Sequence, residues 1–376
     1  MLIKVVQNFY LVFLLLFFVY SLSLFEFVIH SHKEDKINTF LGFICLSFVF
    51  MHLIIFLHLM FQDINLYDFI FPIFLLILVL APSSLGLLLI LSSFIVIIYT
   101  KVKGESIRLQ EFKRDKIKHF NQTSLAKRDN VRKINHVFIF IGMVVVWFIG
   151  VYSVYSVSGS LDGMIPEEND MVSLYLRIFN YPGGFSISLL ALGWFYYVLF
   201  FFFYAFFFFM LINEISRKSV SLKFPTNLFT SLFLTEKEKK YYGSYFYFAV
   251  GHLFASFITP PLVYFAILGI SSLADLSASQ VGIRFGKRRI VWNNNKTWEG
   301  TIACGLISFF ITFLFLGFWW ALIFSIIMVA IDLLTSKPLD ISDNLLIPLT
   351  CSIIYALVRF IFHLNYSAII LFWIEL

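Results

Sequence analysis

Long uninterrupted apolar runs, many of them close to 20 residues, recur along almost the whole chain. A helix of about 20 apolar residues crosses about 30 Å of hydrocarbon and satisfies its own backbone hydrogen bonds, which a lipid-exposed loop cannot do. Apolar residues make up 60% of the chain and charged residues only 13%, about half of the charged share of a typical soluble domain. The sequence therefore predicts an all-α, polytopic integral membrane protein.

These runs predict about 10 or 11 transmembrane helices. The expected spans are Phe9–Val28, Phe40–Met60, Tyr67–Leu80, Leu85–Tyr99, His136–Val157, Phe185–Leu211, Tyr245–Ile258, Pro261–Leu273, Ile302–Phe318, Trp320–Leu334 and Leu345–His363. Residues 1–28 have no small-residue cleavage site before the polar stretch that follows them, so we interpret them as a first span and not as a cleaved signal peptide. Residues 367–376 are too few to cross the bilayer.

Lys and Arg gather in two stretches that predict the orientation. Residues 101–133 carry eleven basic and four acidic side chains, and residues 217–240 carry six basic ones. The stretch between them is acidic around residues 162–170. Short loops rich in Lys and Arg stay in the cytosol, so the acidic stretch is expected outside. The same alternation places residues 282–299 and 335–343 on the cytosolic side.

The basic loops hold most of the formal net charge of +6, which predicts the anionic membrane surface as a partner. No basic stripe is interleaved with exposed aromatic residues, so no nucleic acid is expected to bind. The three cysteines, Cys45, Cys304 and Cys351, lie in apolar runs without paired spacing. This pattern argues against a disulfide framework or a zinc cluster.

Four aspartates stand at or near the ends of apolar runs, and the alternation brings all of them to one cytosolic edge. They are Asp275, Asp332, Asp340 and Asp343. The loop between the first two carries Arg284, Lys287, Arg288, Arg289, Lys296 and Glu299. Carboxylates beside a cationic loop suit a magnesium-bound polyphosphate, because carboxylate oxygens hold the metal while Lys and Arg neutralise phosphate oxygens. A loop that only fixes topology would explain the cations but not Asp275, Glu299 and Asp343.

Three glycines punctuate the same loop. Gly282 and Gly286 bracket Ile283–Phe285, and Gly300 stands at an expected helix start. Glycines there let backbone N–H groups approach an anion, and the dipole of a helix N-terminus favours it. The order of residues is not that of the phosphate loop of soluble nucleotidases.

Six motifs in a fixed order support a family resemblance. They are Arg132–His136, Lys237–Gly243, Ala274–Ser279, Gly282–Arg288, Lys296–Thr301 and Asp343–Leu349. Together they resemble the membrane-embedded, CTP-dependent lipid-alcohol kinases, which comprise the dolichol, phytol and yeast-type diacylglycerol kinases. This family is distantly related to the phosphatidate cytidylyltransferases. The family usually has Gly-Asp at Ala274-Asp275 and a Glu near Asp332, and this chain departs from it at both places.

The resemblance implies transfer of the terminal phosphate of CTP to the hydroxyl of a membrane lipid alcohol, such as a polyprenol, a dolichol or a phytol-like alcohol, with Mg²⁺ as cofactor. It implies that Asp275 and Asp343 are metal ligands or catalytic bases, with Glu299 as the next candidate. The implied nucleotide- and phosphate-binding residues are Lys287, Arg288, Lys296, Asn344, Arg132, Lys133 and His136. His136 is equally well explained as a structural residue at a helix start.

Two other functions remain open at this point. A phosphatidate cytidylyltransferase-type CDP-lipid synthase would use the same kind of site, although the run of Lys, Asp, Gly and His ending in paired aspartates that is typical of those enzymes is missing. A transporter or scaffold would predict internal repeats and helices broken at mid-membrane, and no repeat is visible. The expected organisation is a four-helix membrane region (1–100), a basic cytosolic linker (101–130) and a C-terminal catalytic membrane bundle (131–376).

Overall fold

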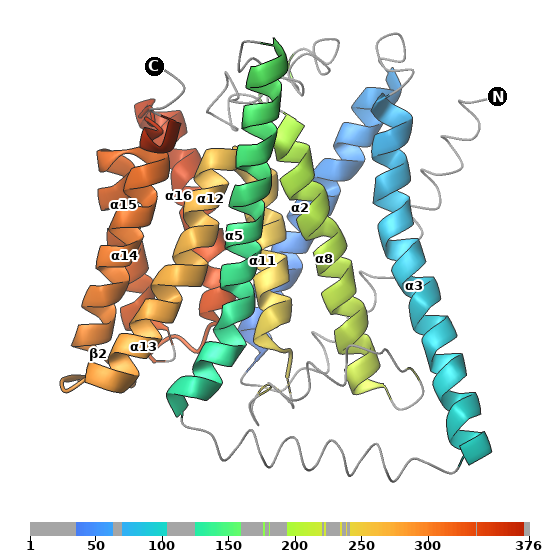
Figure 1. Ribbon diagram of the computed structural model, residues 1–376, viewed down its shortest axis with the longest axis horizontal. Helices are drawn as coiled ribbons and strands as arrows, with labels where there is room; N and C mark the ends of the chain where they lie inside the picture. Colours follow the sequence, from blue (N-terminus) through green and yellow to red (C-terminus); the bar gives the residue numbers. More distant parts are fainter. Residues whose placement is uncertain are drawn as a thin grey trace.

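The computed structural model describes residues 35–62, 70–103, 125–158, 194–219 and 241–371 except 336, with a few single positions between these ranges, including Glu238. Long helices run side by side through these ranges (Figure 1). Seven of the described helices are long and apolar enough to cross a membrane, and two shorter apolar helices accompany them. The predicted class, an all-α polytopic membrane protein, is therefore confirmed.

The helices are α2 (Lys36–Gln62), α3 (Ile70–Lys103), α5 (Leu125–Ser158), α8 (Trp194–Lys218), α11 (Ser244–Ile258), α12 (Pro261–Gly269), α13 (Asp275–Phe285), α14 (Trp298–Leu316), α15 (Phe318–Leu334) and α16 (Asp343–Phe362). A five-residue π-helical turn, Ile270–Ala274, joins α12 to α13. Between α13 and α14, the strands β1 (Arg289–Ile290) and β2 (Asn293–Thr297) form a small antiparallel hairpin. A short 3-10 turn, Ile369–Leu371, follows α16.

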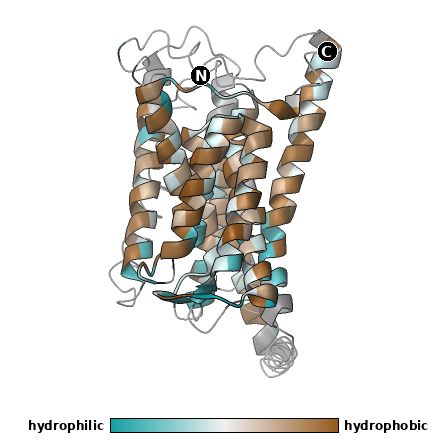
Figure 2. Ribbon diagram, turned by 90° about the vertical axis from the view of Figure 1, so that its left-hand side faces the viewer, coloured by the Kyte–Doolittle hydropathy of each residue, from teal (hydrophilic) through white to brown (hydrophobic). Residues whose placement is uncertain are grey.

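Two short helices form the centre of the bundle. All residues of α12 are buried, and so is α11 from Phe246 to Ile258. Around them pack α2, α8, α14 and α16, while large apolar side chains of α3, α5, α14 and α15 point outward. Figure 2 shows that the flanks of the bundle are hydrophobic and that hydrophilic residues gather at its ends. Such a surface fits lipid and not water.

The region around Pro82 corrects the expected spans, because Tyr67–Leu80 and Leu85–Tyr99 do not form two helices. From Ile70 onward they belong to one helix, α3, which contains Pro82. Proline lacks the N–H that would bond to the carbonyl four residues earlier, here that of Leu78. The Tyr204 hydroxyl of α8 donates to this buried carbonyl at 2.8 Å. The helix therefore continues past Pro82. The hydroxyl that satisfies the Leu78 carbonyl comes from Tyr204, 126 residues further along the chain, so no local sequence pattern predicts it.

The segment after Pro261 also differs from expectation. The span was expected to end at Leu273, but the helical path continues through the π-helical turn and α13, so that Pro261–Phe285 forms one candidate span. Asp275 therefore lies inside a continuous helical segment. The expected first span, Phe9–Val28, and most of the linker lie outside the described residues. The division into three domains stays a prediction.

Candidate active site at one end of the bundle

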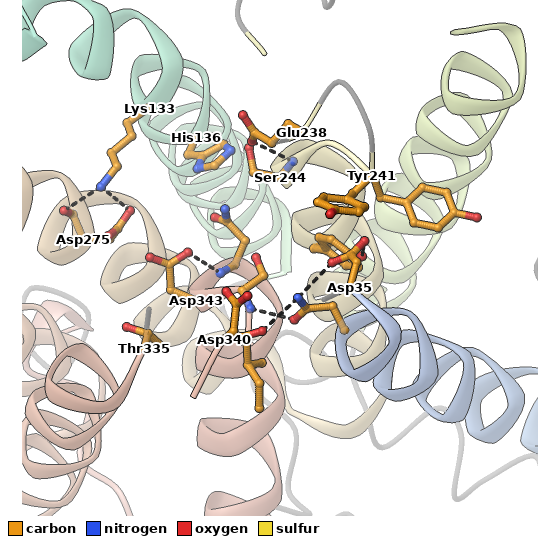
Figure 3. Close-up of a pocket in the computed structure, with 16 residues that line it drawn as sticks. Asp35, Lys133, His136, Glu238, Tyr241, Ser244, Asp275, Thr335, Asp340 and Asp343 are labelled. Atoms are coloured by element: carbon orange, nitrogen blue, oxygen red, sulfur yellow. Dashed lines mark hydrogen bonds and ion pairs between the residues drawn. The ribbon is translucent and has the colours of Figure 1, made fainter. Parts of the chain in front are cut away.

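Polar groups gather at the end of the bundle that carries α13 and the hairpin. The first residues of α2, α5 and α16 and the last residues of α3 and α8 lie at this same end (Figure 1). A cavity of about 350 Å³ opens there (Figure 3). Its lining consists of Asp35, Asn38, Lys133, His136, Glu238, Tyr241, Tyr242, Ser244, Tyr247, Asp275, Thr335, Asp340, Ile341, Ser342, Asp343 and Asn344. Five carboxylates against one lysine and one histidine favour a cation or a cation-bound anion.

Asp275 is held by Lys133, which lies in the third turn of α5. The Lys133 ammonium lies 2.8 Å from Asp275 Oδ2 and also donates to the Asp275 carbonyl oxygen at 3.1 Å. Both side chains are mostly buried, so their attraction is less screened than that of a surface pair. The contact fixes the first turn of α13 against α5 and presents both groups to the cavity (Figure 3).

The π-helical turn explains how Asp275 reaches this position. A π turn inserts one extra residue into a helix and so re-aims the residues that follow it. Ser272 Oγ in this turn donates to the His136 carbonyl at 3.1 Å. Ser271 Oγ lies 2.8 Å from Nε2 of the buried His252, whose Nδ1 lies 2.9 Å from the Tyr264 hydroxyl. These bonds fix the turn to both α5 and α11.

Asp343 reaches the cavity as the first residue of α16. Its Oδ1 accepts from the Asn344 N–H at 2.9 Å. The N-terminus of a helix carries the positive end of its dipole, which favours anions such as phosphate. Gly251 of α11 allows this helix start to pack closely: a Cβ there would lie 2.6 Å from Pro348 Cγ and 2.9 Å from the Asn344 carbonyl oxygen. A side chain at position 251 would therefore displace the Asp343 end of α16.

Lys296, at the end of β2, lies behind the cavity lining. Its ammonium donates to Asp332 Oδ1 at 2.6 Å, and the Thr301 hydroxyl donates to Asp332 Oδ2 at 2.5 Å. Burial tends to lower the pKa of Lys296, but the carboxylates of Asp332, Asp343 and Asp275 outweigh it and raise that pKa above its ordinary value. Lys296 is therefore a permanent cation beside the site, and Asp332 is its partner.

The other predicted site residues lie elsewhere. Lys287 and Arg288 are exposed beside the hairpin, and the Arg288 N–H donates to Glu299 Oε1 and Oε2 at 3.2 and 3.3 Å. None of these three residues lines the cavity. The side chain of Arg132 lies outside the described residues. The cavity thus brings together Lys133, His136, Asp275, Asp343 and Asn344 of the predicted set.

The three glycines of the loop have a packing role in this structure. A Cβ on Gly300 would lie 2.6 Å from the Ala278 carbonyl oxygen, and a Cβ on Gly286 would lie 2.6 Å from Thr297 Cγ2. On Gly282 it would lie 3.1 Å from Thr297 Oγ1. The glycines therefore let α13 approach α14 and the hairpin. That they also open the backbone to an anion stays a prediction.

The carboxylates fit the protein's share of a magnesium site. Within the described part of the chain, no three His, Cys, Asp or Glu side chains converge to hold a metal by themselves. Mg²⁺, however, is usually bound through one or two carboxylates, with water and substrate phosphates completing its shell. Asp275 and Asp343 both face the cavity and supply that number (Figure 3).

Sequence reasoning did not single out several residues of the lining. Asp35 and Asn38 come from α2 and the residue before it, far from every motif, and no signal in the sequence connects them to the site. Thr335 stands near Asp332 and Asp340, and its buried hydroxyl has no hydrogen-bond partner within the described residues. A ligand in the cavity could bond to this hydroxyl.

Fold and cavity together define a polytopic membrane protein with a polar, carboxylate-lined site at one end of its bundle. No family model matches the chain, and no solved structure matches it. Over 93 residues, which are 24% of this chain, the sequence is 37% identical to a phytol kinase from Synechocystis sp.. The match spans 40% of that relative's length. The chain is therefore similar, in part, to a lipid-alcohol kinase.

Proposed function

We propose that the protein is a CTP-dependent kinase that phosphorylates the hydroxyl of a membrane lipid alcohol, a polyprenol or dolichol or a phytol-like alcohol. The observation that carries this proposal is the convergence of Lys133, Asp275 and Asp343 in one cavity at the end of a membrane bundle. A lipid hydroxyl lies at the depth where such a bundle ends, and a nucleotide reaches it from water. The partial likeness to a phytol kinase supports the same class of reaction.

Phosphoryl transfer requires mainly positioning and charge neutralisation from the protein. In the proposed reaction the lipid oxygen bonds to the γ-phosphorus of CTP, the bond between that phosphorus and the bridging oxygen breaks, and CDP leaves. The hydroxyl proton passes to a carboxylate, for which Asp343 is the first candidate. Mg²⁺, when bound, would be held by Asp275 and Asp343 and would neutralise phosphate charge. Lys133 and Lys296 add fixed positive charge near the same place.

We place the cavity on the cytosolic side. The ends of α3 and α8 and the start of α5, which border the two basic stretches, lie at the cavity end of the bundle (Figure 1). The positive-inside rule assigns such ends to the cytosol and to its anionic lipid surface. A Lys287→Cys variant in sealed cells should resist an impermeant thiol reagent until the membrane is opened. Labelling of intact cells would place the cavity outside.

The test of the reaction uses purified protein, Mg²⁺ and CTP labelled at either the α or the γ phosphorus. The lipids offered are polyprenols, dolichol, phytol, diacylglycerol and phosphatidate. The proposal expects label from the γ position in one of the alcohols, and none with Asp343→Asn. Label from the α position in phosphatidate, with release of pyrophosphate, would instead identify a CDP-lipid synthase. Absence of label from both positions would favour a transporter or scaffold.

A further inference from the structure

Asn38, in the first turn of α2, makes three hydrogen bonds with its amide group. Its Oδ1 accepts from the Ser342 N–H at 2.7 Å. Its Nδ2 donates to the Asp340 carbonyl oxygen at 3.3 Å and to Asp35 Oδ1 at 3.1 Å. Asn38 lines the cavity together with Asp35 and Asp340, which are labelled in Figure 3. One side chain of α2 thus binds the backbone of residues 340–342 from both its donor and its acceptor side.

The Asn38 amide is held in place by Asp35, which is itself hydrogen-bonded to α11. Asp35 and Asn38 are both buried, and the Tyr247 hydroxyl of α11 donates to Asp35 Oδ2 at 2.7 Å. The Thr39 hydroxyl also donates to the Asp35 carbonyl oxygen at 3.0 Å. A buried amide with fixed neighbours loses little further freedom when it binds a loop, so it can hold that loop in one place.

The segment that Asn38 binds leads directly into Asp343. Ser342 is the N-cap residue of α16, but its side chain makes no capping hydrogen bond. Its carbonyl oxygen accepts from the N–H groups of Leu345 and Leu346 at 3.1 and 3.0 Å. Any shift of the Ser342 backbone therefore moves the first turn of α16 and, with it, the Asp343 carboxylate.

We infer that Asn38 is a positioning residue for Asp343, so that α2 is a working part of the active site and not a separate membrane anchor. The inference rests on the proposed kinase function. A misplacement of about 1 Å in a reacting group can cost on the order of 100-fold in rate, so loss of this amide should lower kcat. Binding of nucleotide and lipid should change less, because the cations assigned to phosphate, Lys133 and Lys296, lie on α5 and β2 and are not held by Asn38.

The experiment uses the full-length protein and three variants. Asn38→Leu keeps the size of the side chain and removes all three hydrogen bonds. Ser342→Pro removes the backbone N–H that donates to Asn38 Oδ1. The φ of −68° at position 342 suits proline. Ile37→Ala, on the exposed side of the same helical turn, is the matched control. Each variant, and the double variant of positions 38 and 342, is measured for kcat, for KM and for hydrogen–deuterium exchange of residues 337–345.

Each position-38 or position-342 variant should lose about tenfold or more in kcat, with KM values within about threefold of wild type. The double variant should be no slower than the slower single variant, because both changes break the same contact. Faster exchange of residues 337–345 should accompany the loss, and Ile37→Ala should resemble wild type throughout. If Asn38→Leu fails to fold, it is replaced by Asn38→Ala, which removes the same three hydrogen bonds without adding a branched side chain and should show the same loss of kcat.

The outcomes separate the inference from the proposed function. Wild-type kcat in a folded Asn38→Leu protein, or additive losses in the double variant, would overturn the positioning role. Unchanged exchange of residues 337–345 would show that Asn38 does not hold the segment, whatever the reaction is. A wild-type protein without any kinase turnover would overturn the proposed function and with it the role for Asn38 in catalysis, while faster exchange would still establish the structural contact.

Discussion

Two groups of charged residues lie at the same end of the bundle, and they differ in what surrounds them. Lys133, Asp275 and Asp343 face a cavity among packed helices, whereas Arg288 and Glu299 lie beside the exposed hairpin. Charges in a buried setting interact strongly because water screens them poorly, while exposed charges interact weakly. The same residue types therefore differ in how strongly they can bind a charged ligand. The packing of the helices around them decides which group is suited to a catalytic site.

The largest effect should come from Asp343→Asn, which removes the first candidate for the proton acceptor. We expect a loss of about 10³-fold in kcat, within the range for a general base, with unchanged membrane insertion. Radiolabelled lipid phosphate measures it. Asp340→Asn changes the neighbouring carboxylate of the same cavity and is the control, with a much smaller loss. Full activity of Asp343→Asn would remove this group from the mechanism.

Breaking the Lys133–Asp275 ion pair should cause the next largest effect, a loss of folding stability. Lys133→Met leaves the Asp275 carboxylate buried without its cation, which costs about 3–5 kcal/mol when one partner of a buried pair is lost. Thermal unfolding in detergent measures the loss. The double variant Lys133→Met with Asp275→Asn should recover much of the stability but none of the activity. A double variant as unstable as the single one would mean that the pair is not the source of the effect.

A middle-sized effect is expected at Lys296, which lies behind the cavity. Lys296→Ala should raise the apparent KM for CTP about tenfold, through loss of positive charge near the phosphates, and change the KM for the lipid less. Asp332→Asn is the matched control, because it removes the partner and keeps the cation. Equal rises in both KM values would point to general disruption of the hairpin.

Substitution of the exposed cations beside the hairpin should have the smallest effect on the kinetics. Arg288→Ala and Lys287→Ala should each change kcat and KM by less than about threefold, because both side chains are exposed and neither lines the cavity. Steady-state kinetics at low and high salt measure this. A tenfold, salt-dependent rise in the KM for CTP would show instead that the hairpin reaches the nucleotide, as the family resemblance implies.

The fold class was accessible from the sequence because lipid imposes one requirement on every span, an apolar helix of sufficient length. The continuity of α3 through Pro82 was not, since it depends on the Tyr204 hydroxyl from another helix. Five of the predicted site residues meet in the cavity because the helices that carry them, α5, α13 and α16, come together at one end of the bundle. Asn38 was beyond reach because a hydrogen bond between segments about three hundred residues apart leaves no local pattern.

That separation also bears on how the protein is made. The ribosome releases α2 early, and its contact with Ser342 lies 304 residues further along the chain. Contacts between such distant segments form late, after the intervening helices have been inserted and packed. A nascent chain that lacks α16 therefore has neither Asp343 nor a complete cavity. The cavity stays incomplete until α16 has been made and has packed against α11, so a chain truncated before Asp343 should not carry out the proposed reaction.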